Sequence, residues 1–308
     1  MKRTVTLGTR GSKLALWQAE WVKRALARNG VTAALEIVET RGDAEIDRPL
    51  HELEGRGFFT KEIEAALLDG RIDVAVHSLK DLPTSLPGGL ALGAVPPRGA
   101  PAEALVTREP RVTSLAGLAT GARVGTSSLR RVAQVRYLRP DVEVVPLRGN
   151  VPTRVTKVKE GRDGLDAALL AAAGLERLDL AGEIAARLDP LEVMPAPGQG
   201  ALGLEVRADD ARARAILASL DDPLTARQVT AERGLLAALG GGCQAPVAAF
   251  VGTRGSELGA RLYGRVTALD GSVQLTASAE IDERDPAGAG AAVADLLRAR
   301  GASKLLGR

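Results

Sequence analysis

The sequence has very few of the residues that bind metals or form disulfides. Its 308 residues include one cysteine, Cys243, and two histidines, His51 and His77. A single cysteine excludes a disulfide within the chain, and these three residues show no recognised metal-ligand spacing, so no metal site is expected. Aromatic residues are also scarce, at 2% of the chain. Few rings are therefore present on which nucleic-acid bases could stack.

Strong charge of one sign and long hydrophobic runs are missing as well. The 41 Lys and Arg residues against 38 Asp and Glu residues give a formal net charge of +3. This surplus is small beside the basic surfaces of nucleic-acid-binding proteins, so nucleic acid is not an expected partner. No apolar run approaches the roughly eighteen residues that span a bilayer, and no signal-peptide core follows the N-terminus. We expect a soluble cytoplasmic protein without a membrane partner.

Hydrophobic periodicity predicts alternating strands and helices, and hence an α/β protein. Strands are expected near 4–8, 35–39, 72–76, 90–95, 122–125, 142–147, 204–206, 260–269 and 273–281. Helices are expected near 14–26, 60–69, 129–138, 223–239 and 287–301, with one more beginning near 152. Thr60 can cap its helix, and Pro152 is a typical first-turn residue.

A partial repeat indicates the domain organisation. Gly8-Thr9-Arg10-Gly11-Ser12 is similar to Gly125-Thr126-Ser127-Ser128, and each lies between a predicted strand and a predicted helix. Two similar α/β domains are the simplest explanation. Segments rich in proline and glycine at 96–101 and 194–200 are interpreted as crossings between these domains. We predict domain 1 at 1–97, regaining about 196–218, domain 2 at 101–193, and a smaller α+β domain at 221–308.

The second crossing runs into a formal G-x-G-x-x-G pattern at 198–203. Such a pattern binds dinucleotides when it follows a strand and opens a helix. Here prolines precede it and the strand-like segment 204–206 follows it. A dinucleotide site is therefore rejected.

One carboxylate and one lysine come directly after a buried-looking strand. The β-branched run 72–76 suits a buried parallel strand, and it leads through His77-Ser78-Leu79 to Lys80 and Asp81. In open α/β sheets, ligands bind beyond the carboxyl ends of the strands. Lys80 and Asp81 are therefore candidate site residues.

Several arginines lie near predicted helix N-termini, where unpaired backbone N–H groups already attract anions. They are Arg10, Arg130, Arg131, Arg148 and Arg154. Arginine forks pair with carboxylates or phosphates, so this set suits a ligand with several acidic groups. A cytoplasmic two-lobed binding or sensor protein for a polycarboxylate would explain the same arginines. Solvated surface arginines paired with nearby Glu and Asp are the simpler alternative.

Cys243 follows three glycines, which free the backbone and predict a mobile or sharply bent loop. Such a loop can carry a reactive thiol into a cleft. Free cysteines are also among the most buried residue types, so a structural Cys243 is an equal alternative. A thiol hydrolase using Cys243 and His77 is a weaker one, because nothing in the sequence places the two together.

Five motifs in the same order resemble the porphobilinogen deaminase family, also called hydroxymethylbilane synthases. They are Thr9-Arg10-x-Ser12-x-Leu14-Ala15-Leu16-Trp17-Gln18, His77-Ser78-x-Lys80-Asp81-x-Pro83, Gly125-Thr126-Ser127-Ser128-Leu129-Arg130-Arg131, Leu147-Arg148-Gly149-Asn150-x-x-Thr153-Arg154 and Gly241-Gly242-Cys243-Gln244-x-Pro246. The likeness runs from the first strand into the third domain.

The resemblance implies a fold, a reaction and a cofactor. The fold would be three domains, the first two resembling type II periplasmic-binding-protein lobes around a cleft, with a smaller α+β domain carrying the cysteine. The reaction would join four porphobilinogen molecules head to tail into hydroxymethylbilane, releasing ammonia, as a step of tetrapyrrole and heme biosynthesis. A dipyrromethane cofactor would be held by a thioether to Cys243. The family also leads us to expect a monomer whose partners are porphobilinogen and the growing pyrrole chain.

The resemblance also implies roles for single residues. Asp81 matches the catalytic carboxylate, which would stabilise the azafulvenium cation formed when ammonia leaves. Lys80 would counter a substrate carboxylate or help to steer the leaving amine. The cofactor would be bound by Cys243, Lys80, Asp81, Thr126, Ser128, Arg130, Arg131 and Arg148. The substrate would be bound by Arg10, Ser12, Gln18, Phe59, Arg148, Arg154, Arg177 and Gln199. One departure from the family pattern is Arg56, because many relatives carry lysine at that position. The resemblance therefore does not say how the loop around Arg56 covers the cleft.

Overall fold

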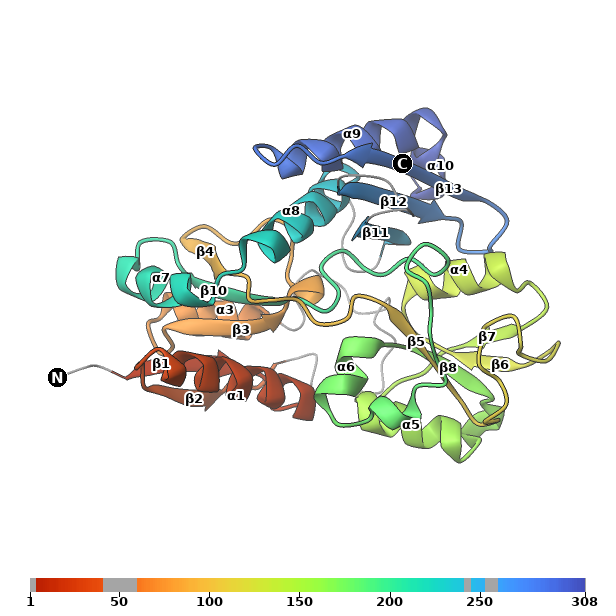
Figure 1. Cartoon of the computed structure of the whole chain (residues 1–308), viewed down its shortest axis with the longest axis horizontal. Helices are drawn as coiled ribbons and strands as arrows, with labels where there is room; N and C mark the ends of the chain where they lie inside the picture. The colour runs from red at the N-terminus through yellow and green to blue at the C-terminus, as the bar shows by residue number, and fades with distance from the viewer. Residues whose placement is uncertain (1–3, 41–59, 241–244, 253–259, 308) are drawn as a thin grey trace.

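A computed structural model describes residues 4–40, 60–240, 245–252 and 260–307 of the chain. It has two α/β lobes, at the left and right in Figure 1, and a third unit above them. Two five-stranded sheets form the lobes and a three-stranded sheet forms the third unit. The predicted fold class, two similar α/β lobes plus a small α+β domain, is confirmed.

The sheet of the first lobe has the strand order β2-β1-β3-β10-β4. These strands are β1 (Val5–Thr9), β2 (Ala33–Ile37), β3 (Val74–Ser78), β4 (Leu90–Ala94) and β10 (Leu202–Arg207). β1 pairs in parallel with β2 and β3, whereas β10 pairs antiparallel with β3 and β4. A strand from the second half of the chain therefore completes the first sheet.

Helices cover both faces of this sheet. They are α1 (Lys13–Arg28), α3 (Lys61–Leu68) and α7 (Ala211–Leu217). α1 buries Val22 and Leu26 against Leu7 and Val74, while α3 buries Ile63 against Ala75 on the other face. Since successive strand residues point to opposite faces, His77 lies on the α3 face with Ala75.

The second lobe repeats the arrangement of the first, with the strand order β7-β6-β8-β5-β9. Its strands are β5 (Glu103–Thr107), β6 (Arg123–Gly125), β7 (Glu143–Val145), β8 (Ala167–Ala171) and β9 (Ala186–Arg187), and its helices are α4 (Leu129–Leu138), α5 (Val151–Lys159) and α6 (Ala172–Arg177). β6 pairs in parallel with β7 and β8, and β5 pairs antiparallel with β8 and β9. β5 thus has the position that β10 has in the first sheet.

The chain passes from the first sheet to the second between β4 and β5, and it returns between β9 and β10. The two passages touch, because Gly99 N donates to Gly200 O at 3.1 Å. Gly200 has a φ of +87°, and a Cβ there would lie 2.6 Å from Gly99 O. Only glycine fits this contact. The domain boundaries given above stay a prediction.

The third unit packs helices against an antiparallel sheet, β11-β12-β13. Its elements are α8 (Pro223–Ala238), β11 (Val247–Gly252), β12 (Arg261–Thr267), β13 (Gln274–Glu280), α9 (Pro286–Ala299) and α10 (Ala302–Leu305). α8 and α9 approach closely, since a Cβ on Gly290 would lie 2.4 Å from Leu235 N. The expected strands and helices are confirmed to within a few residues, but strands β5, β8, β9 and β11 and helices α6, α7 and α10 were not predicted.

Candidate active site

The turn that carries Lys80 and Asp81 is the centre of the candidate site. β3 ends at Ser78 and a single 3₁₀ turn, Leu79–Asp81, follows it directly. Leu79 and Leu82 are buried in one apolar cluster, which anchors the turn at both ends. Lys80 and Asp81 themselves are half-buried. The prediction that they lie just beyond a buried strand is confirmed.

A cavity of about 80 Å³ opens beside Asp81. Its lining includes Arg10, Ser12 and Gln18 from the start of α1, together with Ser78. Gln18 Nε2 donates to Ser78 Oγ at 2.8 Å, which ties α1 to the end of β3. Ser12 caps α1, its Oγ accepting from Ala15 N at 3.3 Å. Arg10, Ser12 and Gln18, predicted from sequence for the substrate, are therefore gathered around Asp81.

His77 lies on the wall of the same cavity, but its ring has a structural partner. His77 Nε2 is 2.9 Å from Glu205 Oε2, and both side chains are buried. This bond joins β3 to β10 inside the first lobe. This contact gives His77 a structural role and does not support the thiol hydrolase alternative.

Lys80 contacts the second passage between the sheets. Its Nζ donates to Gln199 Oε1 at 3.3 Å, and Gln199 Nε2 in turn donates to Pro101 O at 2.8 Å. Burial lowers the pKa of Lys80 to about 8, with a further lowering by Arg131 and an opposing effect of Asp81. Gln199, which the resemblance implies for the substrate, is fully buried and accepts the hydrogen bond from Lys80.

Arg130 and Arg131 share a buried glutamate that was not predicted from the sequence. Arg130 Nη2 lies 2.6 Å from Glu103 Oε1, and Arg131 Nη2 lies 2.7 Å from Glu103 Oε2. Both guanidinium groups also donate to main-chain carbonyls, those of Met194 and Leu169. Burial favours the neutral acid, but Arg131 and Arg130 outweigh it and lower the pKa of Glu103 to about 2.

This arrangement excludes the solvated-surface alternative for Arg130 and Arg131. They are not solvated surface residues, since each is about 95% buried. Both lie in the first turn of α4, at the helix N-terminus where the sequence placed them, and Glu103 of β5 is their shared counter-ion. The only local sign was an acidic residue opening the apolar run 103–106.

Arg148 and Arg154 lie at the start of α5, which Asn150 caps by accepting from Thr153 N at 2.9 Å. Arg154 Nε donates to Gly149 O at 2.7 Å. Burial lowers the pKa of Arg154 to about 10; Arg131 and Arg148 lower it further, and Asp81 opposes this. Charged residues of both lobes therefore affect the pKa of Arg154.

Thr126 and Ser128 form the turn between β6 and α4, as predicted. Thr126 is buried, and its Oγ1 accepts from Ser128 N at 3.3 Å. Ser128 occupies the N-cap position of α4 without a side-chain capping bond. This turn is the counterpart in the second lobe of the turn that carries Arg10 and Ser12.

Arg177 lies against the crossings between the sheets. Its Nη2 donates to Gly200 O at 2.6 Å, and its guanidinium carbon is 5.7 Å from the centre of the Trp17 ring on α1. Burial lowers the pKa of Arg177 to about 10. Its described contacts therefore join α6 to the first lobe. Cys243, Phe59 and Arg56 lie outside the described residues.

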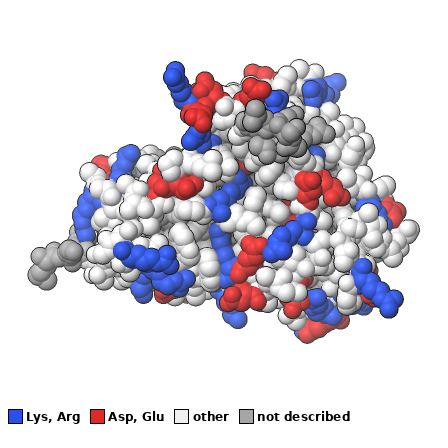
Figure 2. Space-filling model, viewed as in Figure 1, with Lys and Arg blue, Asp and Glu red and all other residues white. Residues whose placement is uncertain are grey.

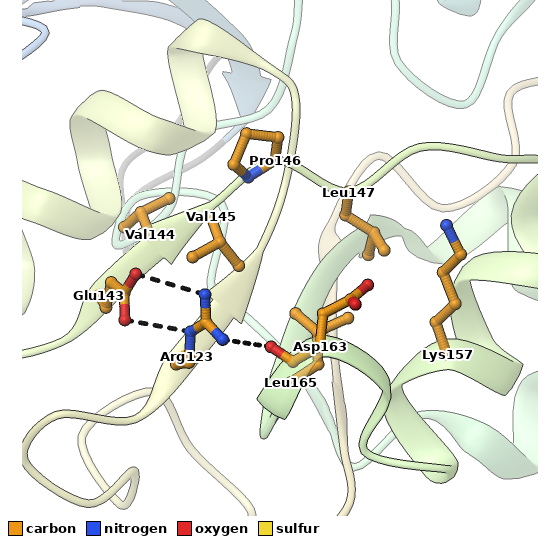
Figure 3. A pocket seen from close by; sticks show the side chains of 9 residues that line it. All are labelled: Arg123, Glu143, Val144, Val145, Pro146, Leu147, Lys157, Asp163 and Leu165. Atoms are coloured by element: carbon orange, nitrogen blue, oxygen red, sulfur yellow. Dashed lines mark hydrogen bonds and ion pairs between the residues drawn. The ribbon is translucent and has the colours of Figure 1, made fainter. Parts of the chain in front are cut away.

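A larger cavity, of about 400 Å³, lies at the edge of the second lobe (Figure 3). Arg123 pairs there with Glu143, Nε to Oε2 at 3.0 Å, and donates to the main-chain oxygen of Asp163. None of the predicted site residues within the described ranges lines it. We therefore place the candidate site at the smaller cavity beside Asp81.

The charges around the smaller cavity suit an anionic ligand. Beyond the effect of burial, Arg131 lowers the pKa of both Lys80 and Arg154, and Asp81 opposes the lowering in each case. Figure 2 shows both charge signs over one face, with Lys and Arg side chains also reaching into the hollow between the lobes. In a site of low dielectric, such cations bind carboxylates strongly, while Asp81 can stabilise a positive charge.

Metal-binding clusters and membrane-spanning helices are both absent from the described parts of the chain. Within residues 4–40, 60–240, 245–252 and 260–307, no three His, Cys, Asp or Glu side chains are grouped so that they could hold a metal ion. Across those same ranges, no helix is both long and apolar enough to span a membrane.

Comparison with known proteins gives matches over nearly the whole chain. The family model "Porphobilinogen deaminase, dipyromethane cofactor binding domain" matches residues 5–215, and "Porphobilinogen deaminase, C-terminal domain" matches 226–299. The porphobilinogen deaminase of Moorella thermoacetica is 49% identical over 98% of this chain and 95% of its own length. That of Roseiflexus sp. (strain RS-1) is 49% identical over 99% of each chain. Among solved structures, a periplasmic substrate-binding protein of an ABC transporter from Coxiella burnetii aligns with 72% of this chain and 94% of its own, at 15% identity and a TM-score of 0.44.

Proposed function

Because this chain belongs to the porphobilinogen deaminase family, we propose that Asp81 is its catalytic carboxylate and that Lys80 holds a carboxylate of the bound pyrrole. The enzyme is a transferase, hydroxymethylbilane synthase, of tetrapyrrole biosynthesis. It joins four porphobilinogen molecules head to tail and releases ammonia at each step. The binding-protein alternative is not favoured, since it gives Asp81 and Cys243 no shared task.

The turn Leu79–Asp81 and its surroundings are the main support for this proposal. The turn is anchored by two buried leucines and presents Asp81 to a cavity that Arg10 and Ser12 also line. A carboxylate fixed in this way needs no reorganisation at the moment when positive charge develops.

Asp81 has two tasks in this mechanism. When ammonia leaves the aminomethyl carbon of porphobilinogen, the pyrrole nitrogen donates electron density and the substrate becomes a cation. The Asp81 carboxylate accepts a hydrogen bond from that N–H and stabilises the charge. It can then take up the proton that the attacked pyrrole carbon loses when the new bond forms.

The cationic residues fit a cofactor that bears several carboxylates. Arg154 is crowded by Arg131 and Arg148, and crowding of like charges favours an anionic ligand among them. Dipyrromethane, when bound, supplies the pyrrole end to which each new unit is added. We assign its binding to Cys243 (covalently), Lys80, Asp81, Thr126, Ser128, Arg130, Arg131 and Arg148. The buried pairing of Arg130 and Arg131 with Glu103 supports a role in orienting that ligand.

For the substrate we keep the set named from the sequence, which is Arg10, Ser12, Gln18, Phe59, Arg148, Arg154, Arg177 and Gln199. The gathering of Arg10, Ser12 and Gln18 around one cavity supports the first three. The contacts of Arg177 and Gln199 with the crossings favour an indirect role for both.

We also propose that the enzyme acts as a cytoplasmic monomer with the domain boundaries given above, and that it has no nucleic-acid partner. The strand order supports the return of 196–218 to the first domain, because β10 lies between β3 and β4. The small net charge of +3 supports the absence of a nucleic-acid partner.

The charge of Lys80 gives a test of this assignment. Its lowered pKa, about 8, means that the ammonium is present below that pH and is lost as the pH rises through it. We therefore expect kcat/KM for porphobilinogen to fall as the pH rises through about 8. In Lys80→Arg the cation persists to about pH 12, so the alkaline fall should move upward even if the maximal rate is lower. An alkaline fall at the same pH in both proteins would exclude Lys80 as its source.

A further inference from the structure

Arg233, a residue outside every motif named above, contacts the turn that carries Lys80 and Asp81. It lies on α8, within the third unit, whereas the turn belongs to the first lobe. Its Nη1 donates to Leu79 O at 3.3 Å and to Leu82 O at 2.8 Å, and its Nη2 donates to Pro83 O at 2.7 Å. One guanidinium therefore bridges the carbonyls on both sides of the Lys80–Asp81 pair.

The turn has few hydrogen bonds within itself to fix its backbone. A single 3₁₀ turn has poor hydrogen-bond geometry, and its last carbonyls have no partner within it. Leu82 N bonds to Leu79 O at 3.2 Å. The apolar cluster under the turn also includes Val229, one helical turn before Arg233 on α8. Helix α8 thus supports the turn in two ways. Val229 packs in the apolar cluster beneath the turn, and the Arg233 guanidinium donates to the carbonyls of the turn.

Helix α8 is itself fixed at the point where the three units meet. Glu232, the residue before Arg233, is fully buried and accepts from Arg98 at 2.8 and 2.9 Å. It also accepts from Gly198 N at 2.7 Å and from Val251 N at 3.0 Å. Both crossings and β11 are therefore bonded to one carboxylate. Arg233 projects from a helix that has a defined place relative to both lobes.

Resting on the function proposed above, we propose that Arg233 is a positioning residue for catalysis: it holds the Lys80–Asp81 turn so that the Asp81 carboxylate meets the reacting pyrrole. Three carbonyl acceptors around one side chain need a planar fork with several N–H donors. A lysine at this position keeps the charge and reaches fewer of the three carbonyls. A methionine keeps the aliphatic stem and reaches none.

Arg207 provides a matched control. It is half-buried like Arg233, and its Nη1 donates to two main-chain carbonyls of the same lobe, Leu67 O and Ile72 O, each at 2.8 Å. Those carbonyls lie before the start of β3, whereas the catalytic turn follows the end of that strand. Replacing Arg207 therefore removes the same kind of contact from the same lobe, together with its ion pair to Asp210 at 2.7 Å, without touching the turn.

The experiment compares cofactor-loaded Arg233→Met, Arg233→Lys and Arg207→Met with the wild type. Intact mass checks cofactor loading, thermal unfolding checks the fold, and kcat and KM are measured with porphobilinogen. We expect Arg233→Met to lose kcat by about 10- to 100-fold, the cost of a small misplacement of a catalytic group, with KM nearly unchanged. Arg233→Lys should lie between it and the wild type. Arg207→Met should lose thermal stability and keep kcat.

Wild-type kcat in Arg233→Met, or equal losses in Arg233→Met and Arg207→Met, would overturn the proposal. If Arg233→Met does not fold, Arg233→Lys decides alone: a lowered kcat at the wild-type KM supports positioning, and the wild-type kcat refutes it. The Asp81→Asn background separates this inference from the assignment of Asp81. There, Arg233→Met should add little to the loss, whereas an undiminished further loss would show that Arg233 acts independently of Asp81. Turnover retained in Asp81→Asn alone would instead refute the role of Asp81.

Discussion

Replacing Asp81 with asparagine is expected to leave a folded, cofactor-loaded protein with almost no turnover. The amide is the same size and can still accept a hydrogen bond, so the turn Leu79–Asp81 should keep its shape. It carries no negative charge to stabilise the substrate cation and cannot take up the proton at pH 7. Removing a positioned acid–base group costs about 10²- to 10⁴-fold in rate. The measurement is kcat for porphobilinogen consumption, with thermal unfolding of the same preparation as a check on the fold.

Asp81→Glu is the matched variant for this test. It keeps the carboxylate and displaces it by one methylene group, so a partial rate should return. Near-normal turnover in Asp81→Asn would remove Asp81 from the mechanism. A rate in Asp81→Glu as low as in Asp81→Asn would mean that position matters as much as charge.

Replacing Glu103 with glutamine is expected to cause a large loss of folding stability. Glu103 is fully buried and pairs with both Arg130 and Arg131 at 2.6 to 2.7 Å. Without its charge, two buried guanidinium groups lose their counter-ion, and the new amide NH₂ faces donors. Breaking a buried pair on one side costs about 3–5 kcal/mol. Chemical unfolding of the purified proteins measures this loss directly.

Glu143→Gln is the control for Glu103→Gln. Glu143 also pairs with an arginine of the second lobe, Arg123, at 3.0 Å, but its side chain is 58% exposed. An exposed pair contributes about 0–1 kcal/mol, so this variant should unfold close to the wild type. We also expect Glu103→Gln to load cofactor incompletely, because Arg130 and Arg131 are no longer oriented. Equal stability of Glu103→Gln and the wild type would contradict this account of the buried charges.

Local sequence patterns were sufficient to predict most of the fold. The similar segments beginning at Gly8 and at Gly125 both proved to be strand-to-helix turns, in two sheets of the same strand order. Strand β11 escaped prediction because the segment from Ala245 to Phe250 is rich in alanine and shows no alternation. Its pairing with β12, and not its own propensity, makes it a strand.

Only those site residues that are marked by the sequence immediately around them could be predicted. Lys80 and Asp81 follow a buried β-branched strand, and this pattern was enough to mark them. Glu103 is remote in sequence from Arg130 and Arg131 and meets them only because β5 lies beneath α4, so no local pattern could pair them. The contact of Arg233 with the catalytic turn depends in the same way on the packing of α8 against the first lobe.

The proposed reaction depends on a pyrrole primer held covalently at Cys243, and the intact mass of the protein measures that attachment. The denatured wild-type protein is weighed beside Cys243→Ser, as purified and again after incubation with porphobilinogen. We expect an excess over the chain mass that matches two linked pyrrole units in the wild type, and the bare chain mass in Cys243→Ser. A wild-type protein that stays at its bare chain mass after porphobilinogen is added, or an equal adduct on both proteins, would contradict the claim.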